Sequence, residues 1–254
     1  MNRVLAAIDT SPCAPAVLAT ARSVAELFEA GVIALHVRED GAEAALQVAR
    51  HADVELREAQ GSPIAAIAAA AADPDVVVVV LGARGVHSGP LPAGRTALEV
   101  VTRVRKPVVV VPPDGTAGAR IARVLTPLEG SGESSQAIAA TIALARRREV
   151  EVVVLHVHAP DEIPAFQDQP QHAIPAWERE FAARFVVDGH ARVEMIERVG
   201  SAEDHIVAAA DDVDADLIAL GWNQQLAPGR AQVVREALAH SAVPVLLVPY
   251  AVGA

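Results

Sequence analysis

Residues 76–112, which read VVVVVLGARGVHSGPLPAGRTALEVVTRVRKPVVVVP, decide the fold of this chain. The segment begins with an apolar run that ends at Gly82, continues through a loop with further glycines, and closes on a second apolar run after Pro107. Short β-branched runs are typical of parallel strands that are covered on both faces. Because the loop leads into a helix-like segment, it offers backbone N–H groups and a helix N-terminus to an anion.

The composition limits the class of protein. A chain of 254 residues with 52% apolar residues is long enough for one large domain or two ordinary ones. The net charge of −11 argues against partners such as nucleic acid or an anionic membrane, which require a basic surface. The single cysteine, Cys13, excludes an internal disulfide framework and fits a reducing compartment. No signal-peptide pattern and no membrane-spanning apolar stretch is visible, so we expect a cytoplasmic protein.

The sequence contains an internal duplication. Three segments recur in the same order in the second half: 3–5 as 123–125, 32–37 as 152–157, and 107–112 as 244–249. Matches that keep their order while the offset changes are what duplication with loop insertion produces. We therefore predict two domains, residues 1–115 and 120–254, with a linker near 113–118 that has turn composition.

Strand-like and helix-like segments alternate in both repeats. The strands are predicted at 3–8, 32–37, 54–59, 76–81 and 108–111, and again at 124–128, 152–157, 191–199, 217–220 and 245–248. Helices are predicted from the turn at 9–12 to about residue 30, and at 42–52, 63–72 and 96–104. This alternation predicts an α/β fold with two tandem, open, five-stranded parallel sheets that carry helices on both faces, as in Rossmann-like domains.

The second repeat is longer than the first because of an insertion. Its extra length falls at 160–175, which is rich in Pro, Gln and Asp and is interpreted as an irregular surface excursion. The following stretch, 176–187, places Trp177, Phe181 and Phe185 at helical spacing. A buried helix face is the favoured interpretation, with a groove for a partner as the alternative.

Several short motifs, repeated in order, resemble those of a known family. They are Asp9 after the first strand, Leu35-His36-Val37, Gly61-Ser62-Pro63, Gly82-Ala83-Arg84-Gly85, Gly94 and the closing run from Pro107. On these residues each repeat resembles a universal stress protein domain, and the whole chain resembles a tandem member of that family. The resemblance implies an adenine nucleotide α-hydrolase-like fold and a role in stress response, and it covers nearly all of both repeats.

The family divides into members that bind ATP and members that do not. Binders carry a Gly-x-x-Gly pair, a spacer, and a third glycine followed by Ser or Thr. Here the spacer is one residue shorter, and Arg95 follows the third glycine with Thr96 next. The nucleotide-binding residues implied by the resemblance are Asp9, Thr10, Val37, Gly82, Arg84, Gly85, Gly94, Arg95 and Thr96. The implied ligand is ATP or AMP, with Mg²⁺ accompanying ATP.

Several of these residues have a physical role that fits an anion, and two have a plain structural alternative. Glycine at 82, 85 and 94 lets the backbone approach phosphate without a Cβ in the way. Arg84 and Arg95 can form charge-assisted hydrogen bonds with phosphate. The alternative for Asp9 is a helix N-cap, and the alternative for Arg95 is a solvated surface arginine.

The second repeat departs further from the nucleotide motif. Glu129 stands where Asp9 stands, Trp222 follows Gly221, Gln224 occupies the place of Gly85, and Ala231 that of Gly94. A tryptophan and a glutamine where backbone must approach phosphate would obstruct it. We therefore predict that repeat two has lost nucleotide binding and supplies stability and an interface.

Other sites have weaker support. His156 and His158 share a strand face and would form a zinc site only with His172 or His190, and no fixed ligand spacing supports this. Three functions stay open: a module that binds an adenine nucleotide for regulation, with slow hydrolysis at most; a scaffold that binds partners without nucleotide; and an enzyme such as an adenylyl transferase, whose expected motifs are missing.

The closing strands predict the assembly. In a tandem chain the run from Pro107 to Val111 can pair with 244–248 inside one molecule, because an unpaired apolar edge is a hazard. We expect a pseudo-twofold monomer or a homodimer of such chains.

Overall fold

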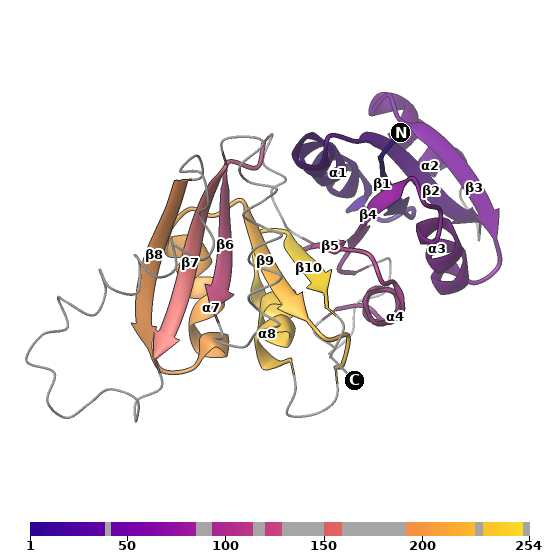
Figure 1. Ribbon diagram of the computed structural model, residues 1–254. Helices are drawn as coiled ribbons and strands as arrows, with labels where there is room; N and C mark the ends of the chain where they lie inside the picture. Colours follow the sequence, from indigo (N-terminus) through magenta and orange to yellow (C-terminus); the bar gives the residue numbers. More distant parts are fainter. Residues whose placement is uncertain are drawn as a thin grey trace, which may run out of the picture.

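A computed structural model describes the chain over residues 1–38, 42–84, 93–113, 120–128, 150–158, 192–226 and 231–250. Strands and helices alternate through the first repeat (Figure 1). Its elements are β1 (Arg3–Ile8), α1 (Ala14–Phe28), β2 (Gly31–Arg38), α2 (Ala42–His51), β3 (Glu55–Gln60), α3 (Pro63–Ala71), β4 (Val76–Gly82), α4 (Arg95–Arg103) and β5 (Val108–Val111). The second repeat contributes β6 (Arg123–Leu128), β7 (Glu151–His158), β8 (Arg192–Val199), α7 (Ala202–Asp212), β9 (Leu217–Trp222), α8 (Gln232–His240) and β10 (Val245–Pro249). The predicted strands, and the predicted helices of repeat one, are therefore confirmed, with ends that shift by one or two residues.

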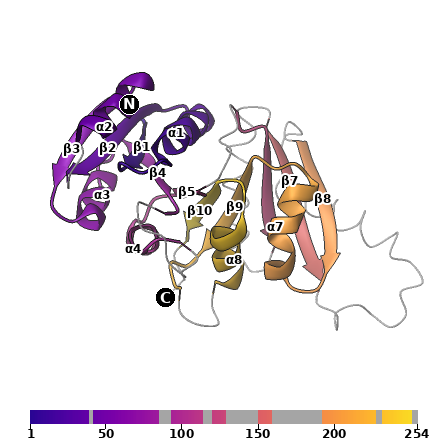
Figure 2. The same ribbon diagram turned by 180° about the vertical axis from the view of Figure 1, so that it is seen from behind.

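The strands of both repeats form one continuous sheet. Its order is β3-β2-β1-β4-β5-β10-β9-β6-β7-β8, so each repeat contributes five neighbouring strands. All pairings are parallel except that between β5 and β10, which run antiparallel with Leu246 opposite Val109. The predicted pairing of the two closing strands within one chain is confirmed. The two repeats meet at this seam in the middle of the molecule, as Figures 1 and 2 show.

Two apolar cores lie on opposite faces of the sheet. Alternate side chains of β4 serve both cores: Val79 and Leu81 face one, and Val78 and Val80 face the other. Helices α3, α4, α7 and α8 cover the first face, and α1 and α2 cover the second. The uninterrupted valine run is therefore explained by burial on both sides of a parallel sheet.

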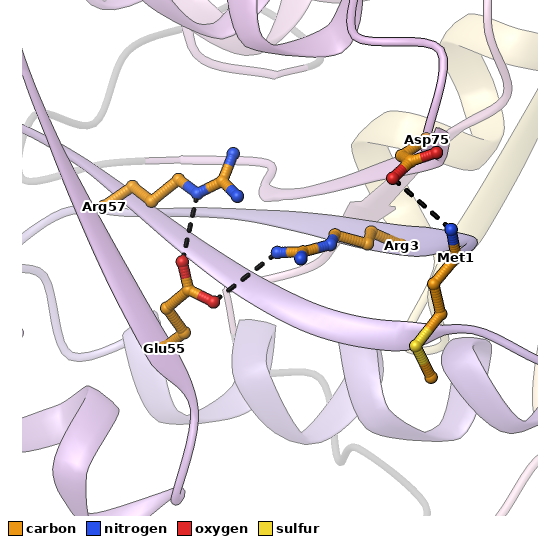
Figure 3. Close-up of polar contacts among 5 residues, drawn as sticks. All are labelled: Met1, Arg3, Glu55, Arg57 and Asp75. Atoms are coloured by element: carbon orange, nitrogen blue, oxygen red, sulfur yellow. Dashed lines mark hydrogen bonds and ion pairs between the residues drawn. The ribbon is translucent and has the colours of Figure 1, made fainter.

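Ion pairs connect the strands of repeat one at their amino-terminal ends (Figure 3). The carboxylate of Glu55 forms ion pairs with the side chains of Arg3, at 3.5 Å, and Arg57, at 3.2 Å. The amino group of Met1 lies 3.4 Å from Asp75. These side chains are substantially exposed, so each pair contributes little to stability. They occupy the edge opposite to the one where the strands end.

Some predicted segments lie outside the described residues. These are the insertion at 160–175, the helix expected at 176–187, and most of the glycine loop, residues 85–92. Within the described residues, no helix is long and apolar enough to cross a membrane.

Candidate functional site

The strand order of repeat one reverses between β1 and β4. From β1 the chain proceeds to β2 and β3 on one side, whereas β4 and β5 lie on the other side. Open α/β sheets bind ligands outside the carboxyl ends of the strands at such a switch point. The predicted phosphate loop begins after β4, beside this reversal of the strand order.

The strand register brings several predicted residues to the same edge. Ala7 pairs with Leu81, and Ile8 pairs with His36. Asp9 and Val37 follow directly after Ile8 and His36, and Gly82 ends β4. Together with Ala83 and Gly94 these residues form what we call the switch edge, defined as Asp9, Val37, Gly82, Ala83 and Gly94.

Asp9 holds the turn that leads into α1. Its Oδ1 accepts a hydrogen bond of 2.9 Å from the backbone N–H of Ser11. The N-cap of α1 is Cys13, which makes no side-chain cap hydrogen bond. The alternative that Asp9 is itself the helix N-cap is therefore wrong, because the helix begins later, at Ala14. Thr10, the next predicted residue, is exposed.

The two described ends of the glycine loop are joined by backbone hydrogen bonds. Gly94 donates its N–H to the carbonyl of Ala83, and Ala83 donates its N–H to Val111 on β5, both at 2.6 Å. The N-terminus of α4 is thereby fixed against the end of β4. Gly85 lies within 85–92, outside the described residues.

The backbone conformation does not explain the glycines of the switch edge. Gly94, the N-cap of α4, has φ −61° and ψ 153°, which any residue can adopt. A Cβ on Gly82 would lie 3.4 Å from the carbonyl of Arg84 and 3.6 Å from a methyl group of Val17, contacts that an alanine could make. Neither position requires glycine for its dihedral angles.

The N-terminus of α4 offers unused donors. The first amides of a helix have no acceptor one turn earlier. Within the described part of the chain, the N–H groups of Arg95, Thr96 and Ala97 have no hydrogen-bond acceptor. Thr96 is exposed and Ala97 is buried. These three amides and the helix dipole can bind an anion.

The two predicted arginines differ in their surroundings. The Arg95 side chain is 85% exposed, and its Nε lies 3.6 Å from Oε1 of Glu99 on the same helix. Glu99 also pairs with Arg103, at 2.6 Å. Arg84 is half-buried and follows Ala83 directly. Arg95 is therefore a solvated surface arginine in this structure, which was the alternative to phosphate binding.

The equivalent edge of repeat two has a different structure. Trp222 was expected to obstruct the approach of phosphate to the backbone, but it is 3% exposed and packs in the core. Ala231 caps α8 in the left-handed conformation, with φ 51°, unlike its counterpart Gly94. Arg235 donates to the carbonyl of Leu226, in the stretch that follows β9. Glu129 lies outside the described residues.

Two contacts around β4 and α4 were not predicted from the sequence. Cys13 lies beside Gly82, with its Cβ 3.9 Å from where a Cβ on that glycine would stand, and its thiol contacts the carbonyl of Pro113 at 3.5 Å. Gln224 contacts α4 from repeat two. Spatial neighbours of this kind leave no mark in the local sequence pattern.

Metal ligation finds no support in the described residues. Among them no group of three or more His, Cys, Asp or Glu side chains is arranged to bind a metal ion. Of the histidines considered for zinc, His172 and His190 lie outside the described residues. His36 is 3% exposed, and its Nδ1 lies 3.1 Å from the carbonyl of Ile8.

Comparisons with known proteins agree with this architecture. The model of the universal stress protein family matches residues 38–112 and 121–249. A universal stress protein from Archaeoglobus fulgidus DSM 4304 is similar in structure, with 16% identity, a TM-score of 0.71 and coverage of 98% of this chain and 97% of that chain. A functionally unknown protein from Pseudomonas aeruginosa PAO1 has 17% identity, a TM-score of 0.63 and coverage of 98% and 92%. No match was found among curated proteins.

Proposed function

Because this chain belongs to the universal stress protein family, we propose that it is a stress-response module whose first repeat binds an adenine nucleotide, ATP or AMP, at the switch edge. The phosphates would approach the backbone of Gly82 and the amides of Arg95 and Thr96. The adenine would lie toward Val37 and Asp9. Any Mg²⁺ would arrive with ATP.

One observation carries this proposal: Gly82 and Gly94 lie at a topological switch point with dihedral angles that do not demand glycine, beside helix amides that have no acceptor among the described residues. Bare backbone next to a helix N-terminus is what a phosphate needs. The resemblance of residues Gly82 to Gly94 to the family's nucleotide loop agrees with it.

We infer that binding serves regulation rather than turnover, with hydrolysis slow at most. The acid of the switch edge, Asp9, already accepts the N–H of Ser11 and so has a structural task. A general base must instead reach the attacking water within hydrogen-bonding distance.

Isothermal titration of the nucleotide-free protein with ATP and AMP tests the proposal. We expect saturable binding of one nucleotide per chain, because repeat two has lost the glycines. The proposal fails if calorimetry detects no heat of binding and equilibrium dialysis detects no bound nucleotide at millimolar concentration.

A second candidate function is a scaffold that binds partners without nucleotide. The observation in its favour is that Arg95 pairs with Glu99 and is 85% exposed, rather than turned toward the loop. Native mass spectrometry of protein purified without added ligand separates the two functions. A copurified nucleotide excludes the scaffold in this form.

A further inference from the structure

The side chain of Gln224 crosses from repeat two to repeat one. Its Nε2 donates to the carbonyl oxygens of Val101, at 3.2 Å, and Val104, at 2.7 Å. The two acceptors fix the orientation of the amide, because only its NH₂ group can donate. Gln224 follows β9, whereas both carbonyls belong to the C-terminal end of α4.

This contact has the chemistry of a helix C-cap. The last carbonyls of a helix have no partner within it and need an outside donor. The carbonyl of Val100 accepts the N–H of Val104, and Gln224 serves the next carbonyl, that of Val101. A donor at this end also interacts favourably with the negative end of the helix dipole.

α4 has a special need for such a cap. It contains only nine residues, and its N-cap Gly94 provides no side-chain hydrogen bond. Helices of this length are marginal without outside support. Arg95 adds a positive charge at the positive end of the dipole. The helix therefore depends on its buried face and on Gln224.

The antiparallel seam explains how a residue of repeat two reaches this helix. Because β5 and β10 run in opposite directions, the carboxyl ends of the strands in repeat two lie beside the amino ends of those in repeat one. The C-terminus of α4 leads into β5 at that amino end. The loop after β9 consequently meets the helix end.

The backbone of Gln224 supports a dedicated role for its side chain. Its φ is 60°, in the left-handed region that disfavours residues with a Cβ. The corresponding residue of repeat one is Gly85, which has no side chain to donate. Two hydrogen bonds offset the cost of placing glutamine at this turn.

We propose that Gln224 is a positioning residue for the nucleotide site of repeat one and acts through α4. The inference rests on the proposed function, since the site is the one at the N-terminus of α4. A nine-residue helix spans about 13 Å, so Gln224 holds the far end of the element that faces the phosphates. Repeat two has thus lost its phosphate loop and supports that of its neighbour.

Three variants of the full chain test this role. Gln224→Gly keeps the backbone conformation and removes the amide. Gln224→Lys keeps a donor for the same carbonyls. Gln225→Ala is the matched control, because Gln225 is the exposed neighbour. The measurements are AMP affinity by calorimetry and hydrogen exchange of the α4 amides without ligand.

We expect Gln224→Gly to weaken AMP binding by about twofold to tenfold, the effect of one or two neutral hydrogen bonds. Exchange of the α4 amides should accelerate in the same variant. Gln224→Lys should keep the AMP affinity and the exchange of the α4 amides near those of the native chain, and Gln225→Ala should change neither. If position 224 served only to form the turn, Gln224→Lys would not bind AMP more tightly than Gln224→Gly.

The outcomes separate this inference from the proposed function. If the native chain binds AMP and Gln224→Gly binds it equally well, the positioning role is overturned and the proposed function stands. If the native chain binds neither ATP nor AMP, the proposed function fails and the positioning role fails with it. If Gln224→Gly does not fold, Gln224→Met, similar in shape but without a donor, decides: weaker AMP binding supports the role, and equal binding overturns it.

Discussion

The backbone N–H of Gly94 donates to the carbonyl oxygen of Ala83 across 2.6 Å, which fixes the start of α4 to the end of β4. Because the bond uses only backbone atoms, it does not depend on which side chain stands at position 94. The structural role and the proposed ligand role of Gly94 can therefore be tested separately.

Gly94→Ala should leave the fold intact and weaken nucleotide binding. Its φ of −61° and ψ of 153° suit alanine, so the free energy of unfolding should change by less than about 1 kcal/mol. A Cβ facing the phosphates should lower the affinity for ATP by about tenfold. Urea denaturation and calorimetry measure the two quantities. Gly31→Ala is the control, because a Cβ there meets nothing within 4 Å. Unchanged ATP affinity in Gly94→Ala would contradict the site.

Substitutions of Asp9 should separate turn formation from ligand binding. Asp9→Asn keeps an acceptor for the N–H of Ser11, so stability should remain near that of the native chain. Asp9→Ala loses this hydrogen bond and should cost about 1 kcal/mol in the free energy of unfolding. Both variants should bind nucleotide more weakly, since both remove the carboxylate. If Asp9→Asn binds as tightly as the native chain, the carboxylate has no part in recognition.

The sequence predicts most of the fold because the decisive signals are local or repeated. β-branched runs such as the one in β4 identify buried strands, and the duplication, combined with the hazard of open edges, predicts the β5–β10 seam. The ion pair of Arg95 with Glu99 follows from their helical spacing and could also have been predicted.

The site was less predictable because its contacts join distant segments. A helix N-cap was the alternative for Asp9, but the helix begins at Ala14 and the carboxylate holds the preceding turn. Trp222 was expected to obstruct phosphate, but it packs in the core. The reach of Gln224 to α4 depends on the register of the seam, which no single segment encodes.

Glu99→Gln should free Arg95 and strengthen phosphate binding. Glu99 pairs with Arg95 at 3.6 Å and with Arg103 at 2.6 Å, and both arginines are exposed, so losing the two pairs should change stability by about 1 kcal/mol or less. Without the competing carboxylate, Arg95 can turn toward an anion at the N-terminus of α4. The affinity for ATP, which carries more negative charge, should rise more than that for AMP, and the gain should shrink with added salt. Arg95→Ala in the Glu99→Gln background should abolish the gain. A gain that survives this double substitution would exclude Arg95 as its source.

Glu151→Gln should lower the thermal stability of repeat two by the same amount across neutral pH. The Glu151 carboxylate accepts a hydrogen bond of 2.8 Å from Nε of Arg123. This bond and the charge of Glu151 raise the pKa of the Arg123 guanidinium above its ordinary value. A raised pKa means that the stabilisation is fully present below the ordinary pKa of an arginine side chain and is lost only at higher pH. The guanidinium therefore stays charged, and its contribution stays constant, between about pH 6 and pH 9.

Thermal unfolding of the native chain and Glu151→Gln at several pH values in this range checks the expectation. Glu55→Gln is the control in repeat one, because Glu55 pairs with Arg3 over a longer 3.5 Å and is more exposed (Figure 3). We expect a smaller loss of thermal stability there. A difference between the native chain and Glu151→Gln that grows toward alkaline pH would contradict the assignment, because loss of the Arg123 charge cannot occur so far below its pKa.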